Sequence, residues 1–185
     1  MMMNRLLWLS RLIDGLNAKV GRLASWLVLA AVLISAGNAV TRKTLNLSSN
    51  AALEIQWYLF SGVFLLCAGA TLLSNEHVRV DVILSRLPRS KQLVIEMLGT
   101  VFFLMPVTVL ILVLSWPSFM TAYTEAEMSP NAGGLIRWPV KLLIPIGFGL
   151  LLLQGVSQFI KSADEYRRLR ASGGPSGTTE QVPRP

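Results

Sequence analysis

The sequence predicts an all-α membrane protein with four transmembrane helices, short amphipathic helices at the membrane surface and both termini in the cytoplasm. Four apolar stretches of bilayer length fill most of the 185 residues. Hydrophobic residues make up 52% of the chain, and the charged residues, 15%, lie almost wholly between the stretches. A helix rises about 1.5 Å per residue, so about 20 residues cross a hydrocarbon core of roughly 30 Å. Because lipid offers the backbone no hydrogen-bond partners, each stretch should be helical.

The predicted spans form one membrane domain, residues 23–165, without room for a separate soluble domain. The spans cover about residues 23–40, 51–73, 93–115 and 139–160. An amphipathic interfacial segment, residues 1–22, precedes them, and residues 166–185 form a basic and then disordered cytoplasmic tail. An uncleaved first helix is favoured over a signal peptide, because the first apolar stretch is long for a cleaved signal and begins late.

Two segments beside the spans have the spacing of amphipathic helices. In the first, residues 6–20, apolar side chains recur at steps of three and four, and the series is Leu6, Leu9, Ile13, Leu16 and Val20. Such a helix lies along the membrane surface or against a partner, and Gly21 would let the chain turn into the first span. The second is residues 80–87, which Pro88 ends.

Positive charge predicts the orientation. Lys and Arg concentrate in the N-terminal segment, the second connection and the tail, which together hold 13 of the 17. Positive residues mark the cytoplasmic side, so these three segments are predicted to be cytoplasmic. Arg42 and Lys43, in the first connection, go against the trend.

The residue inventory points away from an enzyme. The chain has one histidine, His77, and one cysteine, Cys67. Two-histidine haem ligation, a histidine-based zinc site and an intrachain disulfide therefore cannot form. The sequence has no P-loop and no glycine-rich dinucleotide fingerprint. We predict no catalytic residues, no metal site and no cofactor.

Polar groups within the spans are few. Glu54, Glu96 and Lys141 lie within about one turn of a predicted span end, where side chains can reach water. A self-contained carrier usually needs polar groups near its centre, so the chain looks more like a membrane partner of something else. Glu54 and Lys141 begin spans on the same side, and they either form an interhelical ion pair or reach the interface separately. Gly147 and Gly149 allow close packing, either within the bundle or against a larger membrane subunit.

Two parts of the chain resemble the small membrane subunit of TRAP transporters (tripartite ATP-independent periplasmic transporters, DctQ-like). The first is Glu54-Ile-Gln-Trp-Tyr-Leu-Phe, followed after the second span by Asn75-Glu-His-Val-Arg-Val-Asp-Val. The second, Gly134-Leu-Ile-Arg-Trp-Pro-Val-Lys, leads into the fourth span. The residues that carry the resemblance are Glu54, Gln56, Trp57, His77, Arg79, Asp81, Trp138 and Pro139.

The resemblance implies a small permease subunit of a sodium-coupled, binding-protein-dependent uptake system for organic anions (carboxylates) in the bacterial inner membrane. Its partners would be membrane lipid, a periplasmic substrate-binding protein and a large multi-span TRAP membrane subunit that carries substrate and sodium. This chain would be a scaffold for the large subunit and would contribute to the face where the binding protein docks. Two alternatives remain open, a stand-alone small carrier and a cofactor-free membrane anchor of a larger complex; nucleic acid is not an expected partner.

The predicted orientation can be tested with fusions. Alkaline phosphatase fused after Ile160 should be inactive, because its disulfides form only in an oxidising compartment, and a fusion near Asn131 should be active. The reverse pattern would overturn the orientation.

Overall fold

The computed structural model describes residues 2–45, 49–74 and 87–171 of the chain. Over these ranges the elements are α1 (Met2–Leu45), α2 (Asn50–Leu73), α4 (Arg89–Gly99), the π-helical turn η1 (Thr100–Leu104), α5 (Met105–Thr124) and α6 (Trp138–Ala171). The described part contains four helical columns that are long and apolar enough to cross a membrane, with α4, η1 and α5 forming one of them. The predicted all-α class with four spans is therefore confirmed. The predicted interfacial helix at 80–87 lies almost entirely outside the described residues.

α1 is one continuous helix where the sequence predicted a surface helix followed by a span. The turn expected at Gly21 is absent, because a lone glycine in a helix costs only about 1 kcal/mol relative to alanine. Gly21 serves packing instead, since a Cβ at this position would lie 2.6 Å from the Cβ of Ala70 in α2. Members of the apolar series differ in burial: Leu9 and Leu16 are 42% and 45% exposed, whereas Ile13 is buried. Apart from Ile13, the buried residues of α1 are small or polar: Ser10, Asn17, Ala24 and Ala31.

The third and fourth helical columns are longer than their predicted spans. The third runs on to Thr124, so the connection predicted at 116–138 shortens to residues 125–137. Just before Pro106, the Met105 amide donates to the carbonyl of Thr100 five residues back. This π turn places Pro106, which has no amide hydrogen, in the first turn of α5, where none is required. The fourth column continues past the predicted end at residue 160 because its polar C-terminal part is also helical.

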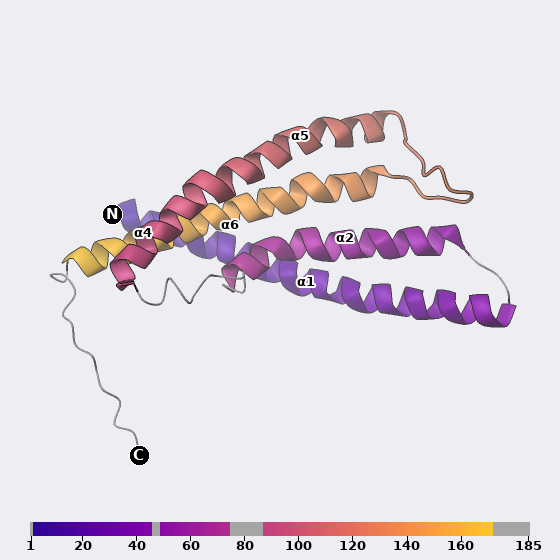
Figure 1. Ribbon diagram of the computed structural model, residues 1–185, viewed down its shortest axis with the longest axis horizontal. Coiled ribbons are helices and arrows are strands. Elements are labelled where there is room, and N and C mark those ends of the chain that lie inside the picture. Colours follow the sequence, from indigo (N-terminus) through magenta and orange to yellow (C-terminus); the bar gives the residue numbers. More distant parts are fainter. Residues whose placement is uncertain (1, 46–48, 75–86, 172–185) are drawn as a thin grey trace, which may run out of the picture.

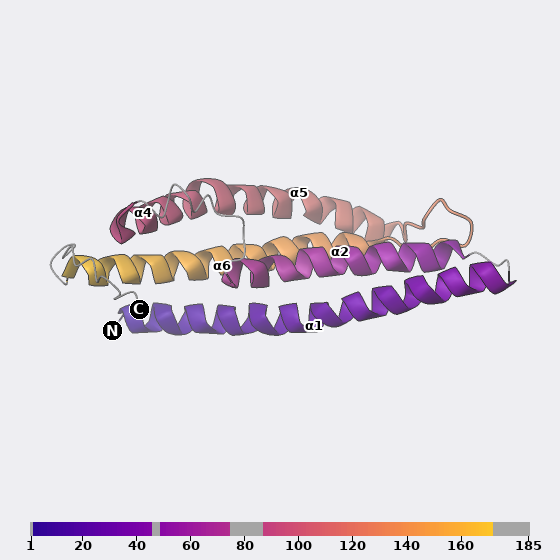
Figure 2. The same cartoon turned by 60° about the horizontal axis from the view of Figure 1, so that its bottom comes forward.

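α6 is the central helix of the bundle. Figure 2 shows α4 and α5 in one layer, α6 and α2 in the middle layer, and α1 in the third. α6 contacts α1, α2, α4 and α5, and its apolar part is the most buried of the four. Both ends of the described chain lie at the same end of the molecule, and the α5–α6 connection lies at the other (Figure 1).

Small residues bring the helices into close contact with α6. A Cβ on Gly147 would lie 2.7 Å from the backbone carbonyl oxygen of Leu65 in α2, and one on Gly155 would lie 2.7 Å from Leu104. A Cβ on Gly149 would be 3.7 Å from Leu112 of α5. Gly147 and Gly149 thus face helices of this chain, which supports packing within the bundle rather than packing against a partner.

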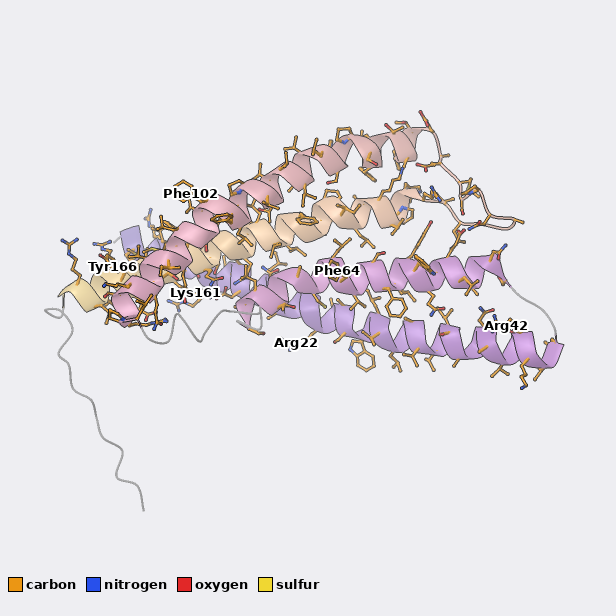
Figure 3. The ribbon with its side chains drawn as sticks, in the orientation of Figure 1. Arg22, Arg42, Phe64, Phe102, Lys161 and Tyr166 are labelled. Carbon is orange, nitrogen blue, oxygen red and sulfur yellow. The ribbon has the colours of Figure 1, made fainter. Side chains whose placement is uncertain are left out.

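The apolar segments of α1 and α6, each bordered by charged residues, are shifted relative to each other along the bundle. Arg22 and Arg42 border the segment of α1, and Lys141 and Lys161 border that of α6; each spans about 30 Å along its helix. Asn17, five residues before Arg22, contacts Gln154 in the middle of α6, and Figure 3 shows Arg22 displaced from Lys161 along the bundle. A bilayer perpendicular to α6 would therefore immerse Arg22, whereas a tilted bundle keeps both cations near one surface.

A polar cluster joins α1 to α6. Its members Ser10, Asn17, Gln154 and Ser157 are buried, and Asp14 and Lys161 at its edge are partly exposed. Asn17 donates to Gln154 (2.9 Å), and Gln154 and Ser157 donate to the Asp14 carboxylate (2.9 and 2.7 Å). Lys161 Nζ lies 2.6 Å from the same carboxylate and balances its charge. Asn17 and Ser157 are completely buried. In apolar surroundings such bonds fix one arrangement of the two helices, since breaking them leaves polar groups without partners.

α2 leaves room for this cluster at Gly69. A Cβ on Gly69 would lie 2.1 Å from Asn17 Oδ1 and 3.3 Å from the carbonyl oxygen of Leu150. Three helices therefore meet at a point where one side chain has to be absent.

Gly69→Ala should lower the free energy of unfolding by about 1–3 kcal/mol, the usual result of overpacking, and should lower the apparent Tm in detergent by several degrees. Gly37→Ala is the matched control, because a Cβ there meets no atom within 4 Å. Adding Asn17→Ala to Gly69→Ala should recover part of the loss by removing the clash. Equal effects at Gly69 and Gly37 would contradict this account.

Candidate functional site

The connection between α5 and α6, residues 125–137, folds as a short hairpin. Met128 and Ile136 form an antiparallel bridge. On either side of it, the Ser129 amide donates to Leu135 O (2.9 Å) and the Arg137 amide donates to Glu127 O (2.8 Å). The sequence favours this turn, because Pro130, Asn131 and two glycines are turn residues, and Gly133 adopts the positive φ of 70° that glycine accepts without strain.

One face of α2 binds the hairpin through three residues spaced four apart. Asn50 donates to the Ala132 carbonyl (3.1 Å) and Tyr58 donates to the Ile136 carbonyl (3.1 Å). Between them, the Glu54 carboxylate accepts hydrogen bonds from Ser129 Oγ, Asn131 Nδ2 (2.8 Å) and the Leu135 amide (2.7 Å). Since residues i and i+4 lie one above the other on a helix, the first two turns of α2 present one continuous surface to the hairpin.

α6 holds the hairpin from its own first turn. Glu127 accepts hydrogen bonds from Arg137 (3.3 Å) and from Lys141. The hydrogen bond from Lys141, reinforced by Arg137, lowers the pKa of Glu127 below its ordinary value. A carboxyl whose pKa is lower in the folded state stabilises that state above its unfolded pKa and loses this contribution as pH falls through the folded pKa. This attachment therefore persists at neutral pH and weakens only in acid.

Aromatic residues line the junction of α5 and α6. Tyr123 packs edge-on against Trp138 with ring centroids 5.7 Å apart, and Phe119 and Trp116 continue the row along α5. Such rings favour the membrane–water boundary, where one part of the side chain is apolar and another can be wet. The hairpin thus begins where the apolar part of the bundle ends.

A pocket of about 390 Å³ lies between α2 and the hairpin. Its lining includes Glu54, Trp57, Tyr58, Asn131 and Arg137. Trp57 is 74% exposed, and the carboxylate of Glu54 is already occupied by its three donors. The pocket can receive a polar or aromatic side chain, and its lining contains no activated nucleophile.

The other end of the bundle is also fixed by ion pairs. Arg89, at the start of α4, binds the Glu165 carboxylate of α6 through two parallel hydrogen bonds of 2.7 and 3.0 Å. A second pocket of about 180 Å³ lies beside this pair and includes Lys161 and Gln158 in its lining. Within the described ranges, no group of three or more His, Cys, Asp or Glu side chains could hold a metal ion.

The structure brings together only some of the residues singled out from the sequence. Glu54 and Trp57 lie at the hairpin, Gln56 donates to Ser35 of α1 (3.2 Å), and Trp138 and Pro139 begin α6. His77, Arg79 and Asp81 lie outside the described residues.

The ion pair considered between Glu54 and Lys141 does not form. Glu54 binds the hairpin and Lys141 binds Glu127, because the hairpin places its own donors and its own carboxylate between the two helices. Sequence reasoning missed Asn50, Tyr58 and Glu127. The spacing of Asn50, Glu54 and Tyr58 by four was the signal that could have revealed the first two.

Comparison with known proteins gives one family match. The model of the family described as "Tripartite ATP-independent periplasmic transporters, DctQ component" matches residues 30–165, which include the last part of α1, all of α2, the hairpin and most of α6. No curated protein and no solved structure matches the chain.

Proposed function

Because the chain belongs to the DctQ family, the small membrane component of tripartite ATP-independent periplasmic transporters, we propose that it is the scaffold of such a transporter. In this role it holds a large multi-span subunit in the bacterial inner membrane. The large subunit carries an organic anion together with sodium, and a periplasmic binding protein delivers the anion. The family is one of transporter components and not of enzymes.

The scaffold role is supported by the polar groups inside the bundle, which form hydrogen bonds with other groups of this chain. Gln154 is bonded to Asp14 and Asn17, and the hydroxyls of Thr100 and Thr108 donate to carbonyls of their own helical column at 2.8 Å. A carrier needs polar groups near the membrane centre that are available to its substrate. Here these groups hold helices together, which suits a static support.

The outer surface of the bundle supports an assembly surrounded by lipid and by another membrane protein. Large apolar side chains such as Phe64 and Phe102 (Figure 3) are 78% and 66% exposed. Close packing and lipid contact both use such faces. The N-terminal part of α1 adds exposed Trp8, Leu12 and Leu16 beside basic residues. In a tilted bundle this part runs close to the cytoplasmic surface, where it would contact anionic lipid.

The hairpin is the part of the chain suited to the binding protein. With both termini cytoplasmic, as the charge distribution favours, it lies on the periplasmic side. It lies beyond the apolar spans and presents polar as well as apolar side chains.

Uptake into vesicles tests the proposal. Transport of a radiolabelled carboxylate, found by screening dicarboxylates, 2-oxo acids and sugar acids, should require this chain, the large subunit, the binding protein and an inward sodium gradient. Omitting this chain should abolish uptake, because the large subunit then lacks its support.

Two results would contradict the proposal. Uptake by this chain alone would favour a stand-alone carrier. Full uptake by the large subunit and binding protein without this chain would show that transport does not require it.

A further inference from the structure

The hairpin of residues 125–137 is held in one position before any partner is present. α2 bonds to it at three positions spaced four residues apart, and Lys141 of α6 bonds to Glu127 of the hairpin. Hydrogen bonds between its own strands close it from within. A surface loop of this length would otherwise sample many conformations, each of which a docking partner would have to exclude.

Glu54 is the centre of this attachment. Its two oxygens receive three donors from three different hairpin residues, Ser129, Asn131 and Leu135. Bonds to a carboxylate are roughly twice as strong as bonds between neutral groups. Asn50 and Tyr58, on either side, each contribute one neutral bond to a backbone carbonyl.

A carboxylate suits the position of Glu54 better than an amide does. The Leu135 amide and Asn131 Nδ2 face its oxygens as N–H donors, and the Ser129 hydroxyl donates as well. A glutamine in its place would offer these donors one neutral acceptor oxygen where the carboxylate offers two charged ones. Glu54→Gln keeps the shape of the side chain and removes part of the attachment, which makes it a specific test.

The hairpin has a face suited to a soluble protein. Met128 and Ile136 stand directly opposite each other in the bridge, so their side chains are on the same face, and they are 56% and 44% exposed. Exposed Asn131 and Glu125 accompany them. Lipid would not suit these polar groups, whereas the centre of a protein interface is apolar with a polar rim.

We propose that Glu54 is a positioning residue that holds the hairpin as a preformed docking surface for the periplasmic binding protein. This inference rests on the proposed function and adds the residue that controls docking. A preformed surface spares the binding protein the loss of conformational entropy that a mobile loop would impose. Glu54 contacts neither substrate nor sodium in this role.

The first measurement is uptake in vesicles that contain both membrane subunits, at increasing concentrations of the binding protein. Glu54→Gln should raise the half-saturating concentration of binding protein by about tenfold, the order expected when a charge-assisted hydrogen bond is lost. The maximal rate and the sodium dependence should stay unchanged. Tyr58→Phe, which removes one neutral bond, should give a smaller increase. Asp164→Asn is the control, because this carboxylate pairs with Arg168 of its own helix near the opposite end of the bundle, and it should leave the value unchanged.

The second measurement needs no partner. A spin label at Ala132→Cys, in a Cys67→Ala background, should be immobile in the parent membrane complex and mobile in Glu54→Gln. A label that stays immobile would overturn the positioning role of Glu54. A label that becomes mobile while the half-saturating concentration is unchanged would overturn the docking role of the hairpin. If parent uptake does not depend on the binding protein at all, the proposed function fails with the docking role, and the label still reports whether Glu54 fixes the hairpin.

Discussion

Helices in lipid gain little from burying apolar side chains against one another, because the lipid is equally apolar, and this constraint shapes the whole molecule. Association has to come from close backbone approach and from polar contacts. α6 supplies both, with Gly147 and Gly155 letting neighbouring side chains and backbone come close, and Gln154 and Ser157 bonding to α1. The same constraint explains why leucines of α1 such as Leu23 and Leu33 are exposed, while small and polar residues of the helix are buried.

The polar groups of this chain have two uses, which differ between the middle of the bundle and its end. In the middle of the bundle they join helices of the same chain, so the membrane-embedded part is suited to support. At the end opposite the termini they hold a hairpin in place, so the part in water is suited to recognition. Glu54 stands between these two parts, since it belongs to a spanning helix and its partners belong to the hairpin. A transporter subunit that provides support and docking needs such a connection between its membrane and aqueous surfaces.

The sequence predicted the helices well and their contacts poorly. Length and hydropathy located four spans because the bilayer imposes both, and the motif residues led to the family. The ends of α2 and the start of α6 were predicted within one residue, but the other helix ends were missed. Hydropathy marks where lipid ends and not where a helix ends, so α1 and α6 continue as polar helices. The sequence placed Glu54 and Lys141 near the same membrane surface. It could not show their separate partners, because the donors to Glu54 lie 75 to 81 residues away and meet it only once the hairpin has folded. The amphipathic pattern of residues 6–20 predicted contact with the membrane surface or a partner, but it could not show that Ser10 and Asn17 bond to α6.

We propose that this chain stays one rigid body while the large subunit moves the substrate. The most direct test is pulsed electron–electron resonance on the assembled transporter in nanodiscs. Spin labels would be placed on the exposed residues Val40 of α1 and Arg167 of α6, in a Cys67→Ala background. The account predicts one narrow distance distribution that does not change when sodium, the transported carboxylate and the binding protein are added in turn. A second distance population that appears with sodium or the carboxylate would contradict it, because the helices of this chain would then take part in the transport movement.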